Sequence, residues 1–353
     1  MSPSPAPAPS VISPKSVLYI LISAALLALT GWYASTLAST SPVLLITASV
    51  FAAYMSINIG ANDVANNVGP AIGARALTMT SAIILAGIME AAGALLAGGD
   101  VVGTIKGDII NPAAISNPQV FIWLMMAALL AGALWLNLAT ALGAPVSTTH
   151  SIVGGVLGAG VAAGGWGIAN WEKLQEIAMS WVISPVLGGL VAAGFLYFIK
   201  HSITYQRDMR AAARRVVPLL TALMAWAFST YIITKGLKQI VKVEMLTAAG
   251  IGVIVGILCW LAMKRYVDRA SQNIENSKAS VNQLFNIPLV CSAALLSFAH
   301  GANDVANAVG PLAAIYDALS QAAVAAKASV PLWVMMIGAL GLVAGLTLYG
   351  PKL

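Results

Sequence analysis

The sequence predicts an all-α, polytopic membrane protein that contains an internal repeat and discontinuous helices. Hydrophobic residues make up 59% of the 353 residues and charged residues only 8%, whereas about a quarter of a soluble domain is charged. Apolar stretches of about 20 residues, the length that crosses a bilayer as a helix, recur along the chain. Two nearly identical eleven-residue strings also occur, GANDVANNVGP at 60–70 and GANDVANAVGP at 301–311, which differ only at Asn67 and Ala308. Polar strings of this kind in an apolar chain indicate a paired, buried polar site.

The order of the elements follows from the apolar stretches. Residues 1–15 are rich in Pro, Ala and Ser and are expected to form a disordered tail. The next run is long for a signal-peptide core, so we expect a retained first helix. The predicted spans are 16–37, 42–59, 78–98, 119–142, 177–199, 216–234, 246–263, 286–299 and 330–349. Two of them end early, at residues 59 and 299, because a GAND string interrupts them. The short, Gly-rich stretch 151–165 is expected to be a half-helix or re-entrant segment.

These spans group into three parts after the tail: a first transmembrane repeat at 16–199, cytoplasmic loops and linking helices at 200–285, and the start of a second repeat at 286–353. Basic residues cluster in two short stretches, 201–215 and 264–278, which we interpret as cytoplasmic loops. The net charge of +6 therefore indicates topology in the cytoplasmic membrane and not binding to nucleic acid.

The two halves are related but not equivalent. The second GAND string follows the first at an offset of 241 residues. By the next span the offset has grown by about ten, which aligns GIMEAAG at 87–93 with GALGLVA at 338–344 and Glu90 with Gly341. Long internal repeats with interrupted helices in corresponding places are typical of secondary transporters.

A hydroxyl-rich element, PVSTTH at 145–150, opens the short Gly-rich segment. Ser147, Thr148 and Thr149 would place three hydroxyls beside the free backbone N–H groups of a helix N-terminus, where the helix dipole also favours negative charge. Such a cradle suits a tetrahedral oxyanion. The alternative is an ordinary helix cap without a ligand, which the presence of two GAND strings in the same chain disfavours.

The carboxylates form the second group of candidates. An unpaired Asp is costly at membrane depth, so Asp63 and Asp304 must be neutralised by a proton, a metal cation or a hydrogen-bond donor. Unwound backbone carbonyls and carboxamide oxygens beside them would suit Na⁺. Alternatively, each Asp accepts a hydrogen bond from a protonated phosphate oxygen, or caps a helix end at the repeat interface. Glu90, within an apolar span, either binds a coupling ion or pairs with a neighbouring amide.

Two histidines stand next to these elements. His150 ends PVSTTH and His300 precedes the second GAND string. Three histidines in the whole chain, none at metal-ligand spacing, predict no zinc site. A structural hydrogen bond is the expected role of His150.

At these residues the chain resembles the inorganic phosphate transporter (PiT) family of secondary carriers. The resemblance rests on both GANDVAN strings, on PVSTTHS at 145–151 and on VVGTIKGDII at 101–110, and it runs from about residue 42 to the C-terminus. It implies inverted-topology repeats, alternating access, a phosphate site near the membrane midplane and coupling to Na⁺ or H⁺. It implies no other cofactor and no enzymatic activity, and a homodimer is kept as an open arrangement.

The resemblance also implies roles for individual residues. The implied phosphate ligands are Asn62, Asp63, Ser147, Thr148, Thr149, Asn303 and Asp304. The implied coupling-ion ligands are Asp63, Asn66, Glu90, Asp304 and Asn307. Sulfate transport by the same kind of carrier is the alternative function. An ion channel or a membrane enzyme is disfavoured, because the duplication builds one site per chain and the loops hold no nucleotide-binding loop or nucleophile–base pair.

One departure from the family pattern stands out. A second PVSTTH-like element is expected about 85 residues after the second GAND string, near residue 386, whereas the chain ends at Leu353. We therefore expect either that the chain is a truncated piece of a longer carrier whose second repeat is incomplete, or that the missing half-site comes from elsewhere.

Overall fold

The computed structural model describes residues 13–37, 39–100, 109–111, 115, 117–236, 243–321 and 330–352. Over this part of the chain the fold is helical and contains no strand, only an isolated bridge between Ile110 and Ala169. Eight of the described helices are long and apolar enough to cross a membrane, and one further apolar helix is shorter. The predicted all-α membrane class is confirmed. The expected disordered tail lies outside the described residues up to residue 12.

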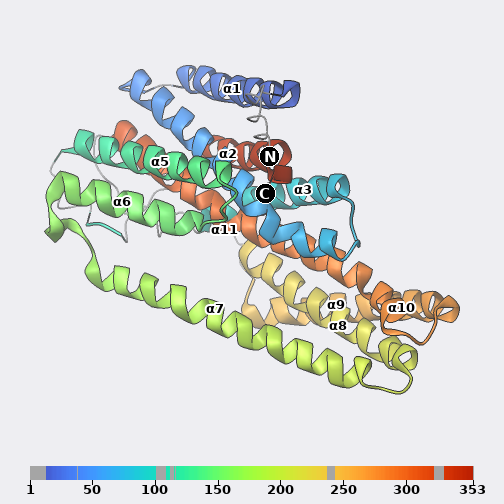
Figure 1. The fold of residues 1–353 in the computed structure, drawn as a ribbon. Coiled ribbons are helices and arrows are strands. Elements are labelled where there is room, and N and C mark those ends of the chain that lie inside the picture. Colours follow the sequence, from blue (N-terminus) through green and yellow to red (C-terminus); the bar gives the residue numbers. More distant parts are fainter. Residues whose placement is uncertain are drawn as a thin grey trace, which may run out of the picture.

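Most helices begin within a few residues of the predicted spans. They are α1 (Pro14–Ser35), α2 (Pro42–Gly73), α3 (Met79–Ala97), α5 (Pro118–Ala141), α6 (Thr148–Gly164), α7 (Trp171–Ile199), α8 (Met209–Tyr231), α9 (Met245–Ala270), α10 (Lys278–Asn282), α11 (Asn286–Gln321) and α12 (Leu332–Leu348) (Figure 1). Of these, α7 and α8 begin earlier and α2, α9 and α11 end later than predicted. Local capping explains several of the starts. The side chains of Ser13, Thr78 and Asn117 each accept a hydrogen bond from a backbone N–H in the first turn of the helix that follows.

The GAND strings do not interrupt their helices, so the predicted ends at residues 59 and 299 are wrong. Both α2 and α11 continue through the strings as single helices of 32 and 36 residues. A continuous helix keeps the backbone hydrogen bonds inside the segment, which avoids the cost of unsatisfied groups at membrane depth. The polar side chains of the strings, and not unwound carbonyls, are therefore what the fold presents to a ligand.

Glycines let four of these helices approach one another backbone to backbone. A Cβ added to Gly60 of α2 would overlap the carbonyl oxygen of Leu342 in α12. In the same way, a Cβ added to Gly301 of α11 would overlap the carbonyl oxygen of Glu90 in α3. Small residues at such contacts are typical of helix packing in membranes. We call the α3–α11 contact the polar crossing and the α2–α12 contact the apolar crossing.

The two crossings are built with a common register. Two further pairs of contacts repeat the pattern. At the polar crossing Gly93 meets the Phe298 carbonyl, and at the apolar crossing Gly345 meets the Ile57 carbonyl. Likewise, Gly98 meets Val305 at the polar crossing, and Gly350 meets Val64 at the apolar crossing. In all three pairs the α11 position follows the α2 position by 241 residues, and the position at α12 or just beyond it follows that at α3 by 252. The structural counterpart of Glu90 is therefore Leu342. The predicted counterpart, Gly341, is wrong by one residue.

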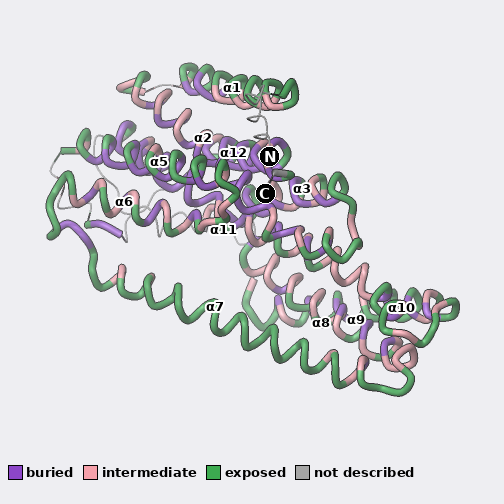
Figure 2. The backbone as a smooth tube through the Cα atoms, in the orientation of Figure 1, coloured by how far each residue is buried: buried purple, intermediate pink, exposed green. Residues whose placement is uncertain are grey.

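The core lies in the bundle that surrounds these crossings. Buried residues concentrate in α2, α5, α11 and α12, whereas α7 contains no buried residue and runs apart from most of the bundle (Figure 2). Large apolar side chains are exposed along α7, as expected for a helix that faces lipid.

The two basic stretches are helix ends as much as loops, which corrects the prediction of two loops. The helix α8 starts at Met209, within 201–215, and α9 continues to Ala270, within 264–278. A hydrogen bond from Asn276 Nδ2 to the carbonyl oxygen of Arg207 (2.8 Å) joins the turn after α9 to the turn before α8. The basic residues of both stretches therefore gather at one end of the α8–α9 hairpin.

Candidate functional site

The hydroxyl element forms the start of α6, as predicted. Ser147 is the N-cap residue, and its Oγ accepts a hydrogen bond from the backbone N–H of His150 (3.2 Å). The first N–H groups of a helix have no acceptor within the helix. The N–H groups of Thr148 and Thr149 are therefore available to an acceptor at the start of α6. The Thr148 side chain is buried, and that of Thr149 is half-buried. The helix start thus combines hydroxyls and amides in one place.

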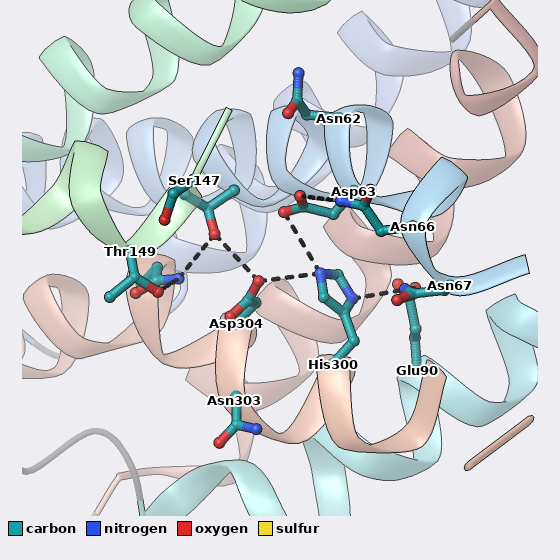
Figure 3. A network of polar contacts seen from close by, with 12 residues as sticks. Asn62, Asp63, Asn66, Asn67, Glu90, Ser147, Thr149, His300, Asn303 and Asp304 are labelled. Carbon is teal, nitrogen blue, oxygen red and sulfur yellow. Dashed lines mark hydrogen bonds and ion pairs between the residues drawn. The ribbon is translucent and has the colours of Figure 1, made fainter. Parts of the chain in front are cut away.

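Asn62 holds this element in position. Its Nδ2 donates to Thr140 Oγ1 (3.0 Å) and to the carbonyl oxygen of Ala144 (3.2 Å), and its Oδ1 accepts from the backbone N–H of Val146 (2.9 Å). The side chain is fully buried and points away from the acidic cluster (Figure 3). Both ends of the carboxamide are engaged by protein groups, so the contacts of Asn62 are those of a structural brace for the 144–146 turn.

The acidic residues converge on His300, which lies one turn before the second signature Asp on α11. The imidazole Nε2 is 3.0 Å from Asp304 Oδ2 and 3.4 Å from Asp63 Oδ2, and Nδ1 is 3.1 Å from Glu90 Oε1 (Figure 3). These carboxylates come from α11, α2 and α3. One side chain therefore joins three helices, and the two signature Asp residues lie side by side as the repeat predicted.

Among the described residues, two carboxylate oxygens of this cluster accept no hydrogen bond of ordinary geometry, although His300 Nε2 lies 3.4 Å from one of them, Asp63 Oδ2. They are Asp63 Oδ2 and Glu90 Oε2, both buried. The other Glu90 oxygen accepts a hydrogen bond from Asn67 Nδ2 (2.8 Å), and Asn66 Nδ2 approaches Asp63 Oδ1 at 3.4 Å. Buried polar groups are normally satisfied, so unpartnered oxygens that face one imidazole fit a proton or a hard cation such as Na⁺.

A chain of hydrogen bonds joins this cluster to the hydroxyl element. Thr148 Oγ1 donates to Asp304 Oδ2 (3.1 Å) and accepts from Asn307 Nδ2 (3.2 Å). The same Asn307 amide also reaches Thr149 Oγ1 (3.3 Å). Asp304 is thus the residue shared by the acidic cluster and the hydroxyl element.

A cavity of about 570 Å³ opens beside this junction. It lies between the start of α6, the middle of α7 and the second GAND string on α11. Its polar lining residues are Ser147, Thr149, His150, Ser180, Ser184, Asn303, Asp304 and Asn307. Asp304 is the one carboxylate among these lining residues, and they include no Lys or Arg. The cavity therefore offers hydroxyls, amides and one acid to a small polar ligand.

The structure brings most of the predicted site residues together. Asp63, Asn66, Glu90, Thr148, Thr149, Asp304 and Asn307 belong to the connected network, and Ser147 lines the cavity. Asn303 also lines the cavity, although its Nδ2 donates to the Ala299 carbonyl of its own helix (2.9 Å). Asn62 stands apart, as described above.

Two members of the network received no role from the sequence. His300 forms its centre, and Asn67 binds Glu90. A signal was present for both, because Asn67 is the position at which the two strings differ and His300 precedes the second string where Ile59 precedes the first. Departures from the repeat therefore marked these residues.

Comparison with known proteins identifies the family. Residues 59–353 match the phosphate transporter family. A Helicobacter pylori (strain J99) protein named "Putative phosphate permease" is 52% identical over 339 residues, which cover 95% of this chain and 63% of that protein. A Pyrococcus horikoshii protein of similar name is 37% identical over 303 residues, covering 84% of this chain and 72% of its own.

A solved structure gives the same result. The protein titled "The sodium-dependent phosphate transporter" superposes with a TM-score of 0.83 at 32% identity, over 88% of this chain and 76% of that one. The chain spans somewhat less than two thirds of the length of the Helicobacter pylori relative. The family match covers most of the chain, and the chain belongs to the phosphate transporter family.

Proposed function

We propose that the protein carries inorganic phosphate across the cytoplasmic membrane by alternating access, as a symporter coupled to Na⁺ or H⁺. The observation that carries the proposal is the continuous network from Glu90 through His300 and Asp304 to Thr148. It connects a group of buried acids, which suit a cation, to a group of hydroxyls and amides, which suit an oxyanion. A carrier that couples an anion to a cation needs both groups in contact.

Phosphate is the anion that fits the cavity best. The hydroxyls of Ser147 and Thr149 and the N–H groups at the start of α6 would donate to its oxygens. Asp304, on the same wall, would accept a hydrogen bond from a protonated phosphate oxygen. Sulfate carries no proton near neutral pH and would place an unprotonated oxygen against this acid. The acid therefore favours phosphate over sulfate.

The coupling cation would bind in the acidic cluster. The unpartnered oxygens of Asp63 and Glu90 are the ligands we propose for it, and Asn66, Asp304 and Asn307 complete the set predicted from the sequence. Without a cation, the negative charge of three acids opposes entry of a second anion. With a cation bound, this repulsion falls, so each ligand raises the affinity for the other.

Uptake of radiolabelled phosphate into proteoliposomes tests the proposal. We expect uptake that saturates with phosphate, that is driven by an inward Na⁺ or H⁺ gradient applied separately, and that is inhibited much more weakly by sulfate than by unlabelled phosphate. A protein-free vesicle preparation gives the background. Uptake that is indifferent to both gradients would disprove coupling, and equal competition by sulfate would disprove the selectivity.

A further inference from the structure

Three of the positions at which the two halves differ near the GAND strings gather at one crossing. The common register of the crossings pairs Asn67 with Ala308, His300 with Ile59 and Glu90 with Leu342. The first member of each pair is polar and the second is apolar. The polar members all lie at the polar crossing, between α3, α11 and the adjoining part of α2 (Figure 3).

The three polar members form one connected unit. Asn67 Nδ2 donates to Glu90 Oε1 (2.8 Å), and the same oxygen is 3.1 Å from His300 Nδ1. The other imidazole nitrogen contacts both signature acids, Asp304 at 3.0 Å and Asp63 at 3.4 Å. These three differences between the halves therefore lie in contact with one another, although they are far apart in the sequence.

The apolar members of the three pairs are fully buried. Ile59, Ala308 and Leu342 are each 0% exposed and belong to the same hydrophobic cluster. The backbone contact beneath them is the same as at the polar crossing, since Gly60 meets Leu342 as Gly301 meets Glu90. The fold therefore already accommodates Ile, Ala and Leu at a crossing of this geometry.

A second observation points to a ligand at the polar crossing alone. Glu90 is 0% exposed, and its Oε2 has no hydrogen-bond donor among the described residues. At the apolar crossing the corresponding side chain, Leu342, has no polar atom that needs a partner. An unsatisfied buried carboxylate oxygen is costly unless a proton or cation binds it.

We propose that the two crossings have different roles: the polar crossing carries the cation dependence of phosphate binding, and the apolar crossing only packs α2 against α12. This proposal rests on the proposed coupling of phosphate to a cation. It makes Asp63 and Asp304 inequivalent although their strings differ at a single position, because His300 contacts both while only Asp304 also accepts a hydrogen bond from Thr148. The cation response passes to the hydroxyl element through Asp304.

The test exchanges residues between the crossings. The swap variant, Asn67→Ala with Glu90→Leu and His300→Ile, gives the polar crossing the three residues found at the apolar one. The matched control, Ile59→Leu with Leu342→Ile, perturbs the apolar crossing while conserving volume, a change that cores usually tolerate. Binding of radiolabelled phosphate to the purified full chain in detergent is measured as Na⁺ replaces choline at constant ionic strength, and again as the pH is lowered.

We expect one of these cations to raise phosphate affinity about tenfold in the native chain and in the control, within the usual range of coupling between sites. In the swap variant the increase should fall below about twofold, with a folded protein by gel filtration and thermal melting. A swap variant that keeps the tenfold response disproves the proposal. A swap variant that fails to fold while the control folds also disproves it, because the polar residues would then be needed for packing and the two roles would not be divided between the crossings.

The native chain separates these failures from that of the proposed function. Phosphate binding that is absent from the native chain would overturn the phosphate assignment, and the division between the crossings would fall with it. Phosphate binding that is present but insensitive to both cations would overturn the coupling on which the division depends. If cations raise phosphate affinity equally in the native chain and in the swap variant, the proposed function stands and only the division of roles between the two crossings is overturned.

Discussion

The hydroxyl of Thr148 donates to Oδ2 of Asp304 over 3.1 Å and so joins two residues that are 156 positions apart. Thr148 belongs to the first turn of α6, and Asp304 to the second signature string on α11. The same carboxylate oxygen is 3.0 Å from His300 Nε2, through which it connects to Asp63 and Glu90. Asp304 therefore belongs to the acidic cluster and also lines the cavity, next to the hydroxyl element.

Replacing Asp63 by Asn should abolish cation-coupled phosphate uptake. The change removes a buried charge whose Oδ2 makes a 3.4 Å contact with His300 Nε2 and no hydrogen bond of ordinary geometry among the described residues, so the proposed cation loses a ligand. We expect cation-driven uptake to fall at least about tenfold, which corresponds to about 1.4 kcal/mol of lost binding. Asp208→Asn is the matched control, because Asp208 caps α8 at an exposed site and Asn also caps helices well. Normal uptake by the Asp63 variant in proteoliposomes would remove this residue from the mechanism.

Replacing Thr148 by Val should weaken phosphate binding while the helix start persists. Val keeps the shape but removes the hydroxyl that links Asp304 with Asn307. The loss of a buried hydrogen bond costs about 1–3 kcal/mol, so we expect an increase in the dissociation constant of roughly tenfold. Thr221→Val removes an equally buried hydroxyl, one that bonds to the Val217 carbonyl far from the site, and serves as the control. Equal loss of affinity in both variants would show that the effect is only structural.

The two signature Asn residues should respond differently to Ala. Asn62→Ala removes three hydrogen bonds that hold the 144–146 turn, so we expect the melting temperature to drop by several degrees. Asn303 lines the cavity and bonds only within its own helix, so Asn303→Ala should weaken phosphate binding with little change in melting temperature. Thermal melting and phosphate titration of both variants decide this. The same effects in both variants would contradict the separation of brace and ligand.

Glycines in the same string should also differ in their tolerance of Ala. A Cβ at Gly60 would overlap the Leu342 carbonyl, whereas one at Gly69 meets nothing within 4 Å. We expect Gly60→Ala to reduce the yield of folded protein and lower its melting temperature, because α2 and α12 must move apart. Gly69→Ala should be neutral or stabilising by up to about 1 kcal/mol, since Ala favours a helix. Gel filtration and melting curves compare the two, and a stable Gly60 variant would refute the close backbone contact.

The class of the fold and most of the site could be predicted from the chain, because both depend on local properties. Composition and the spacing of apolar stretches set the membrane class and most helix positions, since an α-helix must be apolar over about 20 residues to cross lipid. The duplicated string likewise predicted a paired site that contains Asp63 and Asp304, and both carboxylates contact His300 Nε2. The cap at Ser147 also followed from local sequence, because it needs only a hydroxyl next to a helix start.

What the tertiary structure decided is which of these groups meet. Glycine and Asn in the GAND strings favour interruption when they are considered alone, yet tertiary packing at Gly60 and Gly301 keeps both helices continuous. The central place of His300 and the pairing of Asn67 with Glu90 depend on contacts between α2, α3 and α11, which are far apart in the chain. The sequence by itself determined where most helices start and which chemical groups they carry. Only the crossing of those helices decided that Asn62 braces a turn while Asp304 joins the acids to the hydroxyls, because such contacts depend on the distances between helices.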